Sequence, residues 1–451
     1  MTQSLVDSAA LTVLDDVVSR ARKAGADAAD AVMVDGRSVS VGWRLGELES
    51  LERSEGADLG LRVFIGKRQA IVSSADQSPR ALDELVERAV AMAKTVPEDD
   101  FAGLADPDQL ATDLPKLDGF DPTELTADQM IEMVKEAEDT ARQNPAVTNS
   151  EGAQAGWSSS SVAVVGTNGM NFSWRVSNTS LSCVVLAGGG EQGMERDYEY
   201  DTTNYVDALK SPAEIGRKAA ERAARRLGAR RVKSARVPVI YDPRVARGLI
   251  GHLLGAINGS SIARGTSFLK DKMNQPVMAP GITIVEDPHR PRGLRSKPCD
   301  AEGLPNQRRN IVDGGTLTTW LLDLRSARQL GLAPTGHASR GTGSPPSPSA
   351  TNVWIEAGEM SAEDMLAGVK EGVYVTDLFG HGINGVTGDY SRGLAGFWIE
   401  DGKLAFPINE MTVAGNLKDM FMNMTAASDL EMRFGMDAPT VRIDGMTVAG
   451  A

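Results

Sequence analysis

Histidine spacing decides whether this chain could hold a catalytic zinc ion in the simplest way. A zinc hydrolase needs about three protein ligands, an open position for a water whose pKa the metal lowers toward 7, and a carboxylate to take that water's proton. Two histidines about a turn apart on one helix can supply two of the ligands. The four histidines are His252, His289, His337 and His381, each far from the others in sequence. We therefore predict no helical histidine pair and no metal site, although the four could still converge in the fold with aspartate or glutamate.

Serine and cysteine offer no better nucleophile. The serine run at residues 158–161 lacks the GxSxG pattern of a nucleophile elbow, and we expect it to decorate a strand edge. Cys183 lies in an apolar stretch, which predicts a buried, inert thiol. Cys299 follows Lys297 and Pro298, and the neighbouring positive charge could lower the pKa of its thiol. No residue is predicted to be catalytic, but a reactive thiol at Cys299 stays open.

Two histidines are candidates for contact with a substrate. His381 lies between Gly380 and Gly382, where the backbone could approach a peptide closely. His252 lies on a predicted helix, where the competing interpretation is a packing or capping residue. The glycines at 188–190 are followed by no P-loop lysine, so phosphate binding is not expected.

Helices and strands alternate in the first half of the chain. Apolar residues at helical spacing predict a helix over residues 8–24, and residues 30–45 alternate as a strand does. Residues 150–187 indicate a β-meander. Three further helix starts are predicted from capping patterns, at Ser78-Pro79, at Thr126 with Gln129, and at Ser211-Pro212.

Strand patterns dominate the second half, after a helix predicted over residues 243–257. Residues 334–350, rich in Gly, Ser and Pro, predict a long exposed loop. The predicted fold class is α+β: an N-terminal mixed strand and helix domain followed by a C-terminal antiparallel, sheet-rich domain. We expect the first domain to span residues 1–232, in segments of about 1–96 and 120–232, and the second to span 233–451.

Composition limits where the protein works and what it binds. Two cysteines in 451 residues cannot form a disulfide framework, and we expect no signal peptide and no membrane span. A cytoplasmic protein is predicted. The net charge of -14 argues against nonspecific binding to nucleic acid. Residues 217–236 nevertheless carry nine basic side chains, which predict a solvated helix face and linker or, alternatively, a docking surface for an acidic partner.

A series of segments in the second half matches one known family in order. They are 239–259 (VIYDPRVARGLIGHLLGAING), 263–269 (ARGTSFL), 300–303 (DAEG), 312–315 (VDGG), 380–384 (GHGIN), 387–393 (TGDYSRG), 399–403 (IEDGK) and 407–416 (PINEMTVAGN). The chain resembles the TldD/PmbA family, on its PmbA (TldE) side, and the resemblance covers nearly the whole length.

The resemblance implies a function. TldD-like and PmbA-like proteins pair into a heterodimeric metalloprotease that degrades unfolded or short peptides, and in some bacteria the pair trims leader peptides from modified antibacterial peptides. The TldD partner carries an HExxxH helix whose histidines ligate zinc and whose glutamate is the general base; a cysteine near its C-terminus adds a ligand. Aligned on residues 265–267, those motif positions fall on Ile250, Gly251 and Gly255, and no cysteine follows Cys299. Zinc is therefore expected in the TldD-like partner and not in this chain.

The leading hypothesis is a noncatalytic subunit that completes a peptide-binding chamber with a zinc-bearing TldD-like partner. An edge of the C-terminal sheet could hold an extended peptide by strand addition. The residues predicted to contact substrate are His252, Arg264, Thr266, Ser267 and His381. Two alternatives stay open: an independent hydrolase with an unconventional metal or thiol site, and a homodimeric peptide-binding or scaffold protein.

Overall fold

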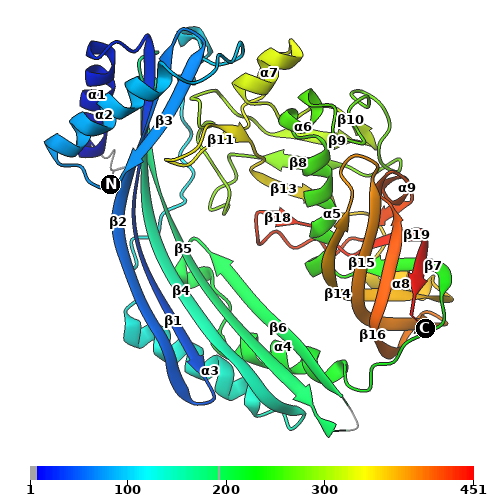
Figure 1. Cartoon of the computed structure of the whole chain (residues 1–451). Helices are drawn as coiled ribbons and strands as arrows, with labels where there is room; N and C mark the ends of the chain where they lie inside the picture. Colours follow the sequence, from blue (N-terminus) through cyan, green and yellow to red (C-terminus); the bar gives the residue numbers. More distant parts are fainter. Residues whose placement is uncertain (1–7, 191–192, 451) are drawn as a thin grey trace.

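One long, curved antiparallel sheet forms the first half of the molecule in the computed structural model, which describes residues 8–190 and 193–450. Its strands are β1 (Ala28–Arg44), β2 (Glu47–Ile65), β3 (Arg68–Ser74), β4 (Val147–Gly166), β5 (Asn171–Gly188) and β6 (Met194–Thr203). They lie in the order β3-β2-β1-β4-β5-β6 (Figure 1). Several of them are about three times the usual strand length of about six residues.

Two pairs of helices cover one face of this sheet. They are α1 (Ser8–Lys23) with α2 (Pro79–Ala93), and α3 (Ala127–Arg142) with α4 (Pro212–Arg225). Met33 and Val41 of β1 pack into the first and second helical cores respectively. Because strand residues alternate between faces, both pairs lie on the same side. Val32 points to the opposite face and packs with Cys299 from the second half of the chain.

The helix starts agree with the local capping signals. The Ser78 hydroxyl accepts a hydrogen bond from the Ala81 backbone, and Thr126 forms a reciprocal capping box with Gln129. These side chains satisfy N–H groups that the first helical turn leaves without a partner.

The second half contains a closed barrel. Its strands are β7 (Ala235–Tyr241), β14 (Glu371–Ile383), β15 (Asp389–Glu400), β16 (Lys403–Asn416), β17 (Met424–Ala426) and β19 (Val441–Ala449). β16 pairs with β15 on one side and with β19 on the other, which closes the ring through β7 and β14. Closure leaves fewer free edges in this sheet than the sequence led us to expect.

A second C-terminal sheet faces the barrel across α5 (Pro243–Ala256). Its strands are β8 (Ile284–Asp287), β9 (Arg309–Asp313), β10 (Thr316–Leu317), β13 (Asn352–Ile355) and β18 (Met436–Asp437). Figure 1 shows α5 between the two sheets, and the largest apolar core gathers around it. The remaining elements are α6 (Gly259–Ala263), α7 (Leu324–Leu330), α8 (Ala362–Ala367), α9 (Leu417–Met422), the short pair β11 (Ala338–Ser339) and β12 (Ser347–Pro348), and the 3-10 turns η1 (Pro107–Gln109) and η3 (Val206–Ala208).

The predicted α+β class is confirmed, while several local predictions were wrong. The loop at 334–350 is not simply exposed, because His337 and Ala338 are buried and two short strands form within it. The serine run at 158–161 lies in β4, which has neighbours on both sides and is not an edge. Among the described residues, no helix is long and apolar enough to cross a membrane.

Candidate functional site

The helix α5 lies at the centre of the predicted site. Asp242 caps its start by accepting a hydrogen bond from the Arg244 backbone N–H at 2.9 Å, and Pro243 occupies the first turn. Ile250 is only 1% exposed and belongs to the core. Gly251 and Gly255 lie on the outer face, and a Cβ added to either would meet no heavy atom of the described chain within 4 Å. Gly248 shares this open face, one turn earlier.

His252 contacts the barrel. Its ring lies edge-on to Tyr390 of β15, with centroids 5.8 Å apart. Burial, followed by the positive charge of Arg392, lowers the pKa of the His252 imidazole to about 4. The ring is therefore neutral at neutral pH, which suits a packed residue or a hydrogen-bonding group and not a cation.

Three residues that follow α5 in the sequence were predicted to contact substrate, and the structure places them in different environments. The Ser267 hydroxyl donates to the Ala256 carbonyl at 2.5 Å and accepts from the Leu269 backbone at 3.0 Å, so it fastens the turn to the end of α5. Arg264 and Thr266 are exposed. The Ser267 hydroxyl is thus used within the chain, and contact with substrate stays a prediction for Arg264, Thr266 and Ser267 alike.

His381 lies on a different surface from His252. It is exposed on β14, within an irregular stretch between Phe379 and Gly382 where the pairing with β15 shifts register. Arg392 connects the two regions, because it donates to the Leu378 carbonyl at 3.0 Å while its charge acts on His252. None of the contacts in the described chain brings His381 and His252 together.

The other histidines and both cysteines have structural partners or are sealed from solvent. His289 hydrogen-bonds Asn306 at 2.6 Å, and His337 hydrogen-bonds Glu286 at 2.6 Å. Burial raises the pKa of Cys183 to about 12, and it raises the pKa of Cys299 further still. The alternative that Lys297 lowers the Cys299 pKa is contradicted, because desolvation of the thiolate outweighs that charge.

The residues at the positions aligned with the zinc motif do not fit a catalytic zinc ion. An alkyl group at 250 and glycines at 251 and 255 have no donor atom, and zinc takes sulfur, nitrogen or oxygen ligands. Within residues 8–190 and 193–450, no three His, Cys, Asp or Glu side chains are grouped so that they could hold a metal ion.

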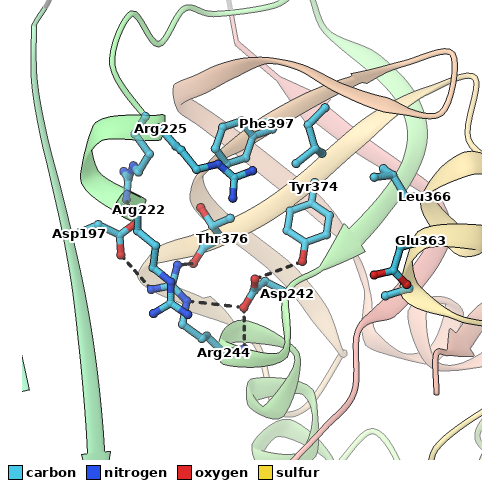
Figure 2. Close-up of a pocket in the computed structure, with 13 residues that line it drawn as sticks. Asp197, Arg222, Arg225, Asp242, Arg244, Glu363, Leu366, Tyr374, Thr376 and Phe397 are labelled. Atoms are coloured by element: carbon cyan, nitrogen blue, oxygen red, sulfur yellow. Dashed lines mark hydrogen bonds and ion pairs between the residues drawn. The ribbon is translucent and has the colours of Figure 1, made fainter. Parts of the chain in front are cut away.

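A charged cavity of about 220 Å³ lies where β6, α4 and the barrel meet (Figure 2). Arg244 donates to Asp197 at 2.9 Å, and the Tyr374 hydroxyl donates to Asp242 at 3.2 Å. Burial alone would lower the pKa of Arg244, but the charge and hydrogen bond of Asp197 raise it overall. Arg226 lies between three carboxylates at 3.3 to 3.6 Å. Four arginines and three carboxylates line the cavity, and their ion pairs connect the curved sheet with α5 and the barrel.

Several basic residues of the segment at 217–236 contact other parts of the chain. Arg222 pairs with Glu199 at 2.5 Å, and Arg230 lies 3.5 Å from the centroid of the Phe406 ring. Arg231 pairs with Glu410 as well. Six of the nine basic residues are nevertheless exposed, namely Arg217, Arg225, Arg230, Arg231, Lys233 and Arg236, which agrees with a solvated face and linker. Docking of an acidic partner stays a prediction.

A buried acidic cluster lies between the curved sheet and the loops of the second half. Asp30 accepts hydrogen bonds from Arg62 at 3.0 Å and from Arg340 at 2.8 Å. Burial would raise its pKa, but the two guanidinium groups lower it to about 2. Glu302 lies 4.0 Å from Arg62 and accepts from the Leu324 backbone at 2.8 Å.

Asp300 and Glu302 hold their protons more strongly than ordinary carboxyl groups. Burial raises the pKa of Asp300 to about 6, and burial together with the charge of Asp300 raises the pKa of Glu302 to about 8. The DAEG segment at 300–303 is part of the family resemblance, and no titration behaviour was predicted for its carboxyl groups. Its chemistry depends on residues brought from β1 and β2, which no local pattern reveals.

An open hollow of about 520 Å³ lies on the face of the curved sheet opposite the helices. Small polar side chains of β1, β2, β4 and β5 form its floor, with Glu52 at one side and Tyr200 of β6 at the other. The lining includes Ser40, Gly42, Ser50, Gln154, Gly156, Ser180 and Ser182. The floor offers hydroxyl, amide and backbone groups that can hydrogen-bond a polar chain.

Comparison with known proteins agrees with this architecture. Three family models match in order: PmbA/TldA metallopeptidase domain 1 at residues 29–93, the central domain at 120–227 and the C-terminal domain at 234–450. The metalloprotease PmbA of Escherichia coli O157:H7 is 39% identical over 446 residues, which cover 97% of this chain and 96% of that protein.

Solved structures share the fold over nearly the whole chain. A Bacteroides thetaiotaomicron protein described as a candidate modulator of DNA gyrase superposes with a TM-score of 0.91 at 26% identity, covering 98% of both chains. TldE from Thermococcus kodakarensis superposes with a TM-score of 0.87 at 21% identity, covering 97% of this chain and 100% of TldE. From the matched domain models and the full-length relative, this chain belongs to the PmbA/TldD family of metallopeptidases.

Proposed function

We propose that this chain is the subunit of a PmbA/TldD metallopeptidase that shapes the peptide-binding chamber and supplies no zinc ligand. The observation that carries the proposal is the chemistry of α5. At the positions that align with the zinc motif of TldD-like proteins, Ile250 is buried in the core, and Gly251 and Gly255 leave an open face. The zinc and the water that it activates then belong to a TldD-like partner in a heterodimer.

The open glycine face supports a role in shaping the chamber. Because Gly248, Gly251 and Gly255 have free space beyond their backbone, a peptide or partner backbone can approach α5 closely. Neutral His252 lies next to this face and can exchange hydrogen bonds with such a backbone.

Unfolded or short peptides are the proposed substrates. The polar hollow on the curved sheet offers a floor without large side chains, which suits a chain of varied sequence. The names of the relatives, metalloprotease PmbA and TldE, support the same class of activity. A cytoplasmic location is part of the proposal, since the two cysteines are unpaired.

The test uses the chain alone and the chain mixed with a purified TldD-like partner. We expect peptide hydrolysis only in the mixture, with its loss on adding a zinc chelator, and a one-to-one complex by size-exclusion chromatography. Chelator-sensitive hydrolysis by the chain alone would overturn the proposal.

Three substitutions guard against an unconventional site in this chain. We expect no peptide hydrolysis by the isolated wild-type chain, and none by the variants His252→Ala, His381→Ala and Cys299→Ser. If the isolated chain hydrolyses peptides and one of these changes abolishes that activity, the independent-hydrolase alternative is correct.

A further inference from the structure

A long stretch of β2 has no neighbouring strand on its outer side. β2 pairs with β1 from end to end, but β3 covers only Leu59–Ile65. The backbone from Glu47 to Asp58 therefore has a free edge in the described part of the chain. Such an edge presents N–H and C=O groups that another extended chain can pair with.

The edge is held firmly at its tip. The turn between β1 and β2 has Leu45 at φ 52 and Gly46 at φ 87, the left-handed pair that a tight two-residue hairpin requires. Glu138 of α3, which is fully buried, accepts hydrogen bonds from both backbone N–H groups of this turn, at 2.9 and 3.2 Å. A rigid edge loses little conformational entropy when a partner strand adds to it.

The two faces of the edge differ in chemistry. Leu51 is opposite Val41 in the register, so it lies on the helix side, and Leu48 lies there with Trp43. These leucines are 42% and 46% exposed. Glu52 is opposite Ser40 and lines the 520 Å³ hollow on the other side. An added strand would thus place alternate side chains over leucines and over a carboxylate in an open hollow.

The charge of the edge selects its occupant. Residues 47–58 contain five carboxylates (Glu47, Glu49, Glu52, Glu55 and Asp58) and one guanidinium, Arg53. Two copies paired along this edge would bring the carboxylates together, which is destabilising for neighbours across strands. A strand that carries lysine or arginine has the complementary charge.

We infer that the Glu47–Asp58 edge of β2 binds extended peptide substrates that carry lysine or arginine, by adding them as a strand to the curved sheet. The basic side chains face Glu52 and the hollow, while apolar side chains between them cover Leu48 and Leu51. The inference rests on the proposed function only in taking peptides as the substrate class.

The test measures binding of two labelled nine-residue peptides to the full-length chain by fluorescence anisotropy. One peptide alternates lysine with valine, and the other alternates glutamate with valine. We expect the lysine peptide to bind at least about tenfold more tightly at low salt, and the difference to shrink as salt is added. Hydrogen exchange should slow within residues 47–58 when the lysine peptide binds, and stay unchanged within 59–65.

A charge-reversed variant and a matched control locate the effect. Glu47→Lys with Glu52→Lys leaves three acidic and three basic side chains in residues 47–58, so it should abolish the preference by weakening the lysine peptide about tenfold. Asp15→Lys with Glu87→Lys makes the same change in net charge on exposed positions of α1 and α2, and should leave the preference intact.

The inference is overturned if neither peptide binds, if both bind the wild-type chain equally, or if the control variant removes the preference as completely as the edge variant does. It is also overturned if binding leaves exchange in 47–58 unchanged. Each of these results is compatible with zinc-dependent hydrolysis by the complex with a TldD-like partner, so failure here is distinct from failure of the proposed function.

Discussion

Buried carboxyl groups in one region of this molecule are held in opposite protonation states. Asp30 lies between two guanidinium groups and stays ionised, whereas Glu302 is farther from Arg62 and shares its surroundings with Asp300. Burial acts on all three in the same direction, so the distance to a cation decides which group keeps its proton. The same reasoning corrects the prediction for Cys299, whose thiol is buried too deeply for Lys297 to activate it.

Glu302→Gln should change how stability depends on pH. The folded-state pKa of about 8 lies above the ordinary value of 4.5, so wild type loses free energy of unfolding as the pH rises through that interval. Glutamine can keep the bond from the Leu324 backbone and has no proton to lose. We expect the variant to match wild type most closely near pH 5 and to exceed its free energy of unfolding increasingly as the pH rises to 8.5.

Urea denaturation at both pH values measures this difference. Glu87→Gln, at an exposed position, is the control and should follow wild type. If the free energy of unfolding of Glu302→Gln depends on pH in the same way as that of wild type, Glu302 is not protonated in the folded protein.

Both cysteines should resist alkylation in the folded protein. Cys183 and Cys299 are buried and have raised thiol pKa values, so little thiolate is present and reagents cannot reach it. Iodoacetamide at pH 8, followed by mass spectrometry, should leave both thiols free until urea is added. Rapid modification of Cys299 in the native protein would restore the thiol alternative.

At the scale of elements, local signals predicted the helices far better than the irregular segments. Capping residues and apolar spacing lie within a few residues of the helices that they define, as in α3. β6 gave no such signal, because its alternate residues Glu195, Asp197, Glu199 and Asp201 are acidic yet buried. Arginines from distant elements neutralise them, for example Arg226 of the α4 end and Arg433. The loop at 334–350 is likewise fixed by distant partners, since Thr342 bonds Asp58, Arg340 bonds Asp30 and His337 bonds Glu286.

Gly60→Ala should disturb the contact between that loop and the curved sheet. A Cβ at Gly60 would lie 2.0 Å from the Thr342 carbonyl oxygen, which is backbone and cannot rotate away. The Thr342 hydroxyl also bonds Asp58, so the loop is fixed at this point. We expect a loss of about 1–3 kcal/mol in the free energy of unfolding.

Gly56→Ala, on the same strand, is the matched control. A Cβ there meets nothing within 4 Å in the described chain, so a change of less than about 0.5 kcal/mol is expected. Equal urea midpoints for the two variants would show that the loop at 334–350 does not pack closely against β2 at Gly60.

At the scale of the whole molecule, buried ion pairs join the curved sheet to the second half. Asp30 pairs with Arg340, Asp197 with Arg244, and Asp201 with Arg433. The order of domains along the chain and the α+β class could be predicted from sequence patterns and the resemblance. These pairs could not, since each joins residues that are far apart in sequence. The division at residues 232 and 233 stays a prediction, which limited proteolysis can test.

Asp30→Asn should destabilise the protein strongly. It leaves Arg62 and Arg340 buried without their carboxylate, a loss on the order of 3–5 kcal/mol. Asp16→Asn removes an exposed partner of Arg20 and should cost at most about 1 kcal/mol. Similar urea midpoints for both variants would contradict the importance of the buried pair.

The central claim is that this chain shapes a peptidase chamber without holding the metal, and metal analysis of the isolated chain tests it most directly. The purified chain is incubated with excess zinc, dialysed, and its zinc content measured together with chelator-sensitive peptide hydrolysis. We predict zinc far below one ion per chain and no hydrolysis, with both gained in the complex with a TldD-like partner. One zinc ion per isolated chain, accompanied by hydrolysis that a chelator abolishes, would contradict it.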